Sequence, residues 1–160
     1  MLKLYRNTNG VINYWETWDN DDKSGTIHLG ELGQHGQSKT VKSGLFSNFH
    51  KEIQKEIDEK IKEGYAPVDE EDLVTLLIEF KVDEMGTPED VDKRTRLQLR
   101  MGETLGWTGL GHCDGGSIGS GTMEVCCFVV DFEVAKKVIE KDLTDTEFSN
   151  YTRIYDESGE

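Results

Sequence analysis

The residues best suited to chemistry lie in a glycine-rich segment, residues 102–121, which holds eight of the chain's 17 glycines. His112, Cys113 and Asp114 are consecutive there, and Ser117 follows. A histidine beside a carboxylate is a pairing used in general acid–base catalysis. Three consecutive side chains on an extended strand do not converge, and only His112 and Asp114 share a side. We therefore predict no catalytic residue and expect His112, Asp114 and Ser117 to form at most a weak binding loop.

The glycines match neither common phosphate-binding pattern. No Gly-Lys-Ser/Thr follows them, and Gly109-Leu110-Gly111 lacks a third glycine at the dinucleotide offset. The segment also follows a predicted helix, whereas the dinucleotide fingerprint follows a strand. Hairpin geometry between two strands accounts better for the glycines. An enzyme using this loop and Asp114 remains an alternative.

Metal-ligating residues do not cluster at the spacings that metals require. The segment 19–25 hints at a calcium loop, but Ser24 stands where glycine is needed and Gly30 where glutamate is needed. We predict a polar hairpin loop there, no metal and no cofactor.

The odd number of cysteines argues against a disulfide framework. Cys126 and Cys127 are adjacent, so on a strand they point to opposite faces, and Cys113 is distant in sequence. Buried free thiols in a reducing compartment are expected. The chain has no apolar run long enough to span a membrane, and its first residues lack the apolar run of a signal peptide. We expect a cytoplasmic protein that does not associate with a membrane.

The net charge of −14 is unevenly distributed. Residues 1–68 carry 9 Lys/Arg and 10 Asp/Glu, whereas residues 69–160 carry 9 Lys/Arg and 22 Asp/Glu, a net charge of −13 for the second part. This asymmetry predicts two domains with different surfaces. An acidic surface repels phosphate backbones and attracts basic partners.

The first part predicts an antiparallel sheet followed by one long helix. Four strand-forming runs are separated by turn signals, among them Asn9-Gly10; the expected strands are 2–8, 11–18, 26–32 and 38–42. A helix is expected over residues 45–63, because large apolar residues recur there at spacings of three and four, namely Phe46, Phe49, Ile53, Ile57 and Ile61. We place the domain boundary between residues 67 and 68.

The second part predicts the order β-α-β-β-α-β, which is the ferredoxin-like arrangement. Thr87-Pro88 is a strong helix start, as an N-cap followed by proline. The expected elements are strands 73–82, 123–130 and 148–155, a strand within the glycine-rich segment, and helices 87–105 and 132–143. On the first of these helices, Lys93, Arg96 and Arg100 form a basic stripe that we expect to be a solvated face paired with neighbouring acids.

Three features of residues 11–65 resemble the WGR domain, a module named for a Trp-Gly-Arg triplet. They are the aromatic run Tyr14-Trp15-Glu16-Thr17-Trp18, the glycine-rich stretch with Gly30, Gly33, Gly36 and Gln37, and the closing Lys60-Ile61-Lys62-Glu63-Gly64-Tyr65. The resemblance implies the family's fold, an antiparallel sheet with one long helix. The second part is similar to small uncharacterised bacterial ferredoxin-like domains, which implies no activity.

The triplet positions hold Leu29-Gly30-Glu31 in this chain. In the family the tryptophan packs at the nucleic-acid contact and the arginine pairs with phosphate or a neighbouring domain. Here Leu29 has no aromatic face for stacking, and Glu31 repels phosphate. We therefore carry over the fold and not the nucleic-acid function. Leu29, Gly30, Glu31 and His35 are predicted to form a surface that meets protein.

These observations favour a non-enzymatic, two-domain α+β interaction protein whose partner has a basic surface. A bacterial inhibitor or immunity-type role would suit its acidity. One alternative is a nucleic-acid-associated WGR protein, whose basic patch would comprise Lys39, Lys42, Lys51 and Lys55. A homodimer is a further alternative. We expect Trp15, Trp18 and Trp107 to be core residues, and an exposed one would be a candidate interface anchor.

Overall fold

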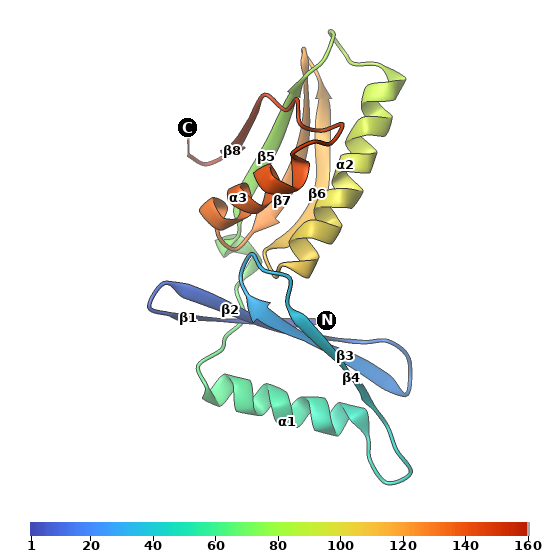
Figure 1. The fold of residues 1–160 in the computed structure, drawn as a ribbon, viewed down its shortest axis with the longest axis vertical. Coiled ribbons are helices and arrows are strands. Elements are labelled where there is room, and N and C mark those ends of the chain that lie inside the picture. The colour runs from blue at the N-terminus through green and yellow to red at the C-terminus, as the bar shows by residue number, and fades with distance from the viewer. Residues whose placement is uncertain (160) are drawn as a thin grey trace. The chain divides into compact units, whose positions relative to one another are not determined.

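A computed structural model describes residues 1–159 and contains three α-helices and two antiparallel four-stranded sheets (Figure 1). The α+β class predicted from the sequence is confirmed. The chain divides into two compact units, Met1–Asp69 and Glu70–Glu160, and each contains one of the sheets. None of the helices in residues 1–159 is long and apolar enough to cross a bilayer.

The first unit is a four-stranded meander followed by a helix. Its sheet has the order β1-β2-β3-β4, and all neighbours are antiparallel. Asn9 and Gly10 both have positive φ, 52° and 86°, as the predicted type I′ turn requires. The elements are β1 (Leu2–Thr8), β2 (Val11–Asp19), β3 (Ser24–Glu31), β4 (Gln37–Lys42) and α1 (Phe49–Lys62).

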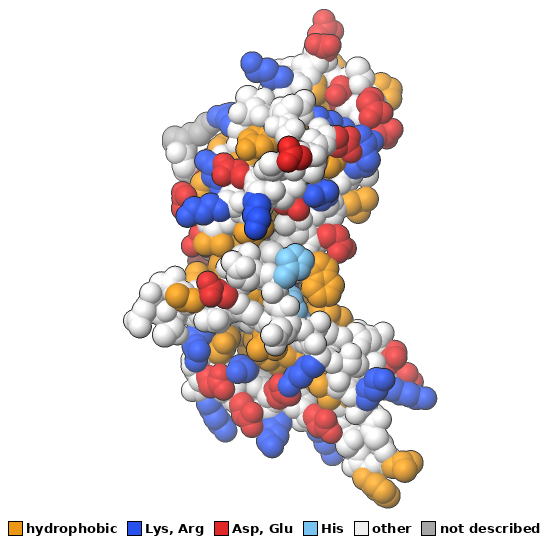
Figure 2. Space-filling model, in the orientation of Figure 1, with side chains coloured by type: hydrophobic (Ala, Val, Ile, Leu, Met, Phe, Trp, Pro, Cys, Tyr) orange, Lys and Arg blue, Asp and Glu red, His pale blue; other side chains and the backbone are white. Residues whose placement is uncertain are grey.

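The helix α1 begins at Phe49, so the prediction that it starts at residue 45 is wrong. Asn48 keeps an extended backbone, and its side chain accepts the N–H of His50, which makes it the N-cap. Phe46 therefore lies in the β4–α1 loop and is fully exposed, as is Leu45. Figure 2 shows exposed hydrophobic side chains where Figure 1 places this loop. Phe46 fits the helical spacing of apolar residues, but it precedes the N-cap Asn48 and so lies outside the helix.

One face of the first sheet packs against α1. Phe49 and Ile53 of the helix are buried with Trp15 and Ile27 of the sheet, and Leu4 completes this contact. Ile61, predicted on the same face, is 55% exposed because it lies in the last turn of α1. The core of this unit therefore rests on the first half of the helix.

The second unit contains one sheet and two helices. Along the chain, each helix connects two strands of that sheet. The strand order is β6-β7-β5-β8, and all three pairings are antiparallel. The elements are η1 (Glu70–Asp72), β5 (Val74–Lys81), α2 (Pro88–Trp107), β6 (Gly111–Gly119), β7 (Thr122–Val129), α3 (Phe132–Leu143) and β8 (Arg153–Asp156). The glycine-rich segment supplies β6 and the turn to β7, so its predicted hairpin is confirmed.

The last strand is shorter than predicted. Residues 148–150 belong to a turn, in which Ser149 donates its N–H to the carbonyl of Thr146, and β8 begins only at Arg153. Phe148 is buried from that turn, at 4% exposure. The alternation of polar and apolar residues over 148–155 therefore predicted too long a strand, because Phe148 is a buried residue of a turn.

The tryptophans differ in burial. Trp15 is buried in the first unit and Trp18 is half-buried, but Trp107 at the end of α2 is 41% exposed. The prediction that all three are core residues is wrong for Trp107. Its indole N–H donates to Glu103 one turn earlier, so the ring lies along the surface of the helix.

Two glycines inside α2 give a stability prediction. A Cβ added to Gly102 or Gly106 would meet nothing within 4 Å, whereas one at Gly116 would lie 2.1 Å from the carbonyl oxygen of Glu124. Each of Gly102→Ala and Gly106→Ala is expected to stabilise the second unit by about 0.5–1 kcal/mol, since alanine loses less conformational freedom in a helix. Thermal unfolding should show higher midpoints for both and a lower midpoint for Gly116→Ala. A lower midpoint for the helix variants would contradict the open environment.

Candidate functional site

The second sheet leaves one face uncovered by its own helices. In β7, Met123, Val125, Cys127 and Val129 are fully buried, while the residues between them are partly exposed. The helix α2 packs against β6 and β7 and also against α3 (Figure 1). Both helices bury apolar side chains. Since side chains alternate across a strand, Glu124, Cys126 and Phe128 belong to the open face.

An acidic depression of about 430 Å³ lies at one end of this open face. Leu73 and Phe128 are its apolar part, and the ring of His112 stacks on Phe128 with centroids 5.3 Å apart. The carboxylates of Glu70, Glu71 and Asp114 complete the lining. The structure thus brings His112 and Asp114 to one surface and adds two acids that the sequence did not single out.

Ser117 belongs to a different part of the open face. Its hydroxyl donates to Glu124 over 3.1 Å, and Tyr155 donates to the same carboxylate over 2.5 Å. The hydrogen bond to Glu124 raises the pKa of Tyr155 to about 12, because an ionised tyrosine could not donate it. Ser117 therefore does not line the depression, although the sequence predicted one binding loop for His112, Asp114 and Ser117.

Glu79 and Glu124 are directly opposite on β5 and β7, an arrangement that is unfavourable for like charges. Arg153 relieves it by pairing with Glu79 at 3.0 Å, and its guanidinium lies 3.9 Å from the centre of the Tyr155 ring. These side chains hold one another in place, and a catalytic role would require them to change partners. Their network is better suited to shaping a surface than to proton transfer.

Two of the three residues of the basic stripe on α2, Arg96 and Arg100, pair with acids of the unit, as predicted, whereas Lys93 does not. Arg96 pairs with Glu89 and Glu147, which raise its pKa, and Arg100 pairs with Asp142 at 2.7 Å. Lys93 donates to the Asn150 side chain over 2.9 Å. The acids that pair with the stripe come from the turn and helix regions near residues 142–150, in addition to α2 itself. Arg96 and Arg100 are therefore engaged with acids that do not line the depression.

The first unit contains a buried chain of polar side chains, beside Gly30, that sequence reasoning missed. Glu16 accepts from His28 Nδ1 over 2.7 Å, and Tyr14 lies 3.3 Å from His28 Nε2. All three side chains are buried, at 4% exposure or less. Lys3 also pairs with Glu16, at 3.2 Å. The only sequence signal was the alternation of Tyr14 and Glu16 on one side of a strand, opposite His28 on its neighbour.

The retained glycine of the triplet has a packing role beside this chain. A Cβ on Gly30 would lie 2.9 Å from the Cα of Gly36, and one on Gly36 would lie 2.3 Å from the Tyr14 hydroxyl. The two glycines therefore let the turn after β3 close over Tyr14, whose hydroxyl donates to the carbonyl of Gln34 over 3.2 Å. Leu29 is 37% exposed, and Glu31 and His35 are exposed, whereas Gly30, the fourth residue of the predicted surface, is half-buried.

Tyr14 gives the first unit a predictable sensitivity to alkali. Burial, together with the nearby charge of Glu16, raises its pKa from 10.0 to about 12. The unfolded chain therefore ionises first, and the contribution is complete below about pH 10 and is lost as the pH rises towards about 12. In urea unfolding between these pH values, Tyr14→Phe should lose stability less steeply than the unaltered chain. Equal slopes would show that Tyr14 is not protected from ionisation.

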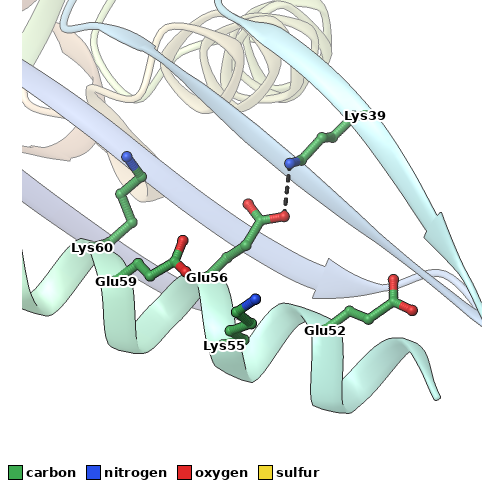
Figure 3. A pocket seen from close by; sticks show the side chains of 6 residues that line it. All are labelled: Lys39, Glu52, Lys55, Glu56, Glu59 and Lys60. Carbon is green, nitrogen blue, oxygen red and sulfur yellow. Dashed lines mark hydrogen bonds and ion pairs between the residues drawn. The ribbon is translucent and has the colours of Figure 1, made fainter. Parts of the chain in front are cut away.

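The lysines proposed for nucleic-acid binding are interleaved with acids. Lys39 of β4 forms an ion pair of 2.7 Å with Glu56 of α1, and Lys55 stands between Glu52 and Glu59 (Figure 3). These residues line a surface depression of about 490 Å³ between the strand and the helix. Mixed charges of this kind give phosphate no continuous positive surface.

The described residues contain no group of three or more His, Cys, Asp or Glu arranged to hold a metal ion. Fold and surface together define a two-unit α+β protein with an open antiparallel sheet that carries an acidic depression. Comparison of the chain with protein families, with curated proteins and with solved structures found no match.

Proposed function

We propose that this chain is a non-enzymatic protein-interaction module whose second unit binds a partner with a basic surface. The observation that carries the proposal is the acidic depression, where Glu70, Glu71 and Asp114 surround an apolar part formed by Leu73 and Phe128. Lysine and arginine combine an apolar stem with a cationic head, and such a surface complements both parts. An inhibitor or immunity-type role, in which the acidic unit covers a basic groove, is consistent with this chemistry.

The internal pairing of basic residues supports the same proposal. Arg96, Arg100 and Arg153 are each engaged with carboxylates of the second unit. Their charges therefore compete little with a basic partner for the acids of the depression. Long-range attraction from the net charge of −14 would speed the encounter, and salt would weaken it.

We also propose WGR-like and ferredoxin-like folds for the two units. The meander of the first sheet with α1 on one face supports the former. For the second, numbering the strands of the unit in chain order makes the sheet order 2-3-1-4, with a helix before the second and fourth strands. This order and the antiparallel pairings support the proposed ferredoxin-like fold.

The experiment measures binding of a fluorescently labelled arginine- and lysine-rich peptide to the full chain by anisotropy. We expect affinity to fall between about 50 and 300 mM salt, as screening predicts. The triple variant Glu70→Gln/Glu71→Gln/Asp114→Asn should bind at least about tenfold more weakly, a change of about 1.4 kcal/mol.

A matched control removes the same number of acids outside the depression. Two of them follow the C-terminal end of β5, and the third lies in the α3–β8 connection. The variant Asp83→Asn/Glu84→Gln/Asp145→Asn changes exposed residues away from the depression. It should lose much less affinity than the first variant. Equal losses in both variants would contradict the site and leave only a general charge effect, and binding that does not weaken with salt would contradict the proposal itself.

Two alternative functions remain open to direct tests. Nucleic-acid association requires a gel shift at low salt that is lost when Lys39, Lys42, Lys51 and Lys55 are replaced. An enzyme using the glycine-rich loop requires an activity that is lost in Asp114→Ala and His112→Ala. The interleaved acids around Lys39 and Lys55 favour the interaction module over the first alternative.

A further inference from the structure

Two of the three cysteines face each other across the β6–β7 hairpin. Cys113 of β6 is the direct register partner of Cys127 of β7, so both side chains are on the same face of the sheet. Cys126 is adjacent to Cys127 in sequence but points to the opposite face. The sequence did not predict that Cys113 and Cys127 are neighbours, because the β6–β7 hairpin separates them along the chain.

The distance between such partners suits a disulfide bond. Directly opposite residues on antiparallel strands have Cα atoms about 4.5–5.5 Å apart, which lies within the range of about 4.4–6.8 Å found for disulfides. Both thiols are free, and the Sγ of Cys113 donates to the backbone carbonyl of Cys126 over 3.2 Å. Cys113 is partly exposed and Cys127 is fully buried, so an external reagent reaches the pair through Cys113.

We propose that Cys113 and Cys127 form a redox-sensitive pair that a low-molecular-weight disulfide, such as glutathione disulfide, oxidises to a cross-strand disulfide. The bond would join the two strands beside the register shift between Cys113 and Gly116. His112 and Asp114, the neighbours of Cys113, line the acidic depression. Oxidation would therefore fix the hairpin at the surface through which we propose that the partner binds, although the redox pair itself does not depend on that function.

The reaction proceeds by two thiol–disulfide exchanges. The Cys113 thiolate attacks one sulfur of glutathione disulfide, forms a mixed disulfide and releases one glutathione. The Cys127 thiolate then attacks Sγ of Cys113, closes the protein disulfide and releases the second glutathione. Two protein thiols are oxidised, one glutathione disulfide is reduced to two glutathiones, and the two thiol protons pass to the released thiolates.

The second exchange is expected to be slower than the first. The neighbouring Cys113 thiol and burial both raise the pKa of the Cys127 thiol, so little of it is thiolate near neutral pH. A mixed disulfide on Cys113 should therefore be observed before the cross-strand bond.

The experiment treats the full chain with excess glutathione disulfide, traps remaining thiols by alkylation, and measures intact mass and proteolytic peptides. We expect the mixed disulfide first, then a product lighter by two hydrogens whose peptides join Cys113 to Cys127. Dithiothreitol should reverse it. The oxidised protein should also unfold at a higher temperature, because the bond constrains the unfolded chain.

Three variants decide the assignment. Cys126→Ser, which removes the adjacent thiol on the opposite face, should keep both the linked peptide and the rise in unfolding temperature. Cys113→Ser should lose both, and since Cys113 is partly exposed this variant is expected to fold. Cys127→Ala should stop at the mixed disulfide on Cys113. The proposal is overturned if the unaltered chain forms no internal bond, if the linked peptides contain Cys126, or if Cys113→Ser still shows the rise.

Discussion

Replacing Phe49 with alanine is expected to destabilise the first unit by about 3–5 kcal/mol, whereas replacing Phe46 should change its stability by less than about 0.5 kcal/mol. Phe49 is 1% exposed and packs with Trp15, Ile27 and Ile53. Its removal would leave a cavity that helix and sheet cannot easily close. Phe46 lies in the β4–α1 loop with its side chain in water, so its removal creates no cavity.

Urea unfolding followed by tryptophan fluorescence measures this difference. A Trp107→Phe background leaves Trp15 and Trp18 as reporters, and both belong to the first unit. The two variants are matched, because each shortens a phenylalanine to alanine within the same few residues. Similar losses for Phe46→Ala and Phe49→Ala would contradict the helix start at Phe49 and would favour the longer helix that the apolar spacing predicts.

Replacing Glu16 with leucine is expected to destabilise the first unit by about 3–5 kcal/mol, the usual effect of removing one partner from a buried polar pair. The change would leave the Nδ1 group of His28 without its carboxylate, and His28 is only 1% exposed. Lys3, the other partner of Glu16, is partly exposed, and its ammonium can turn to water. Lys3→Gln is therefore the control and should cost about 1 kcal/mol or less.

A double-mutant cycle separates the pair from its members. The variant Glu16→Leu/His28→Leu replaces both polar groups, and a buried pair exchanged for apolar side chains is often close to neutral. We therefore expect the loss of unfolding free energy in the double variant to be smaller than the sum of the losses in the two single variants, by at least about 1 kcal/mol. Strictly additive losses, measured by urea unfolding in the Trp107→Phe background, would show that Glu16 and His28 are not coupled.

Local sequence signals predicted most of the strands and the α2 helix because each was determined by nearby residues. Asn9-Gly10 adopts the positive φ angles of its turn without help from the rest of the chain. Thr87 and Asp90 form a reciprocal capping box, so the start of α2 is also a local property. The failures were at places where local patterns allowed two outcomes. Phe46 matched the helical spacing but lay before the cap, and Phe148 matched strand alternation but is buried from a turn.

The candidate site could be predicted only in part. The alternation of His112 and Asp114 placed both on one side of a strand, and the structure brings both to one depression. Glu70 and Glu71 could not be linked to them, because more than 40 residues separate the two pairs in sequence. The same holds for Glu16 and His28, whose contact depends on the register of β2 against β3. Strand register is a long-range property that composition and periodicity do not specify.

The sequence by itself determined the α+β class, the acidity concentrated after residue 68 and the hairpin in the glycine-rich segment, because propensity, charge and turn geometry are local or additive. Only the tertiary structure decided which side chains meet. It paired Cys113 with Cys127 and not with Cys126, and it joined His112 and Asp114 to Glu70 and Glu71. The physical reason is common to these cases: the contacts arise from the register and packing of strands distant in sequence, where a shift of one residue would turn each side chain to the other face.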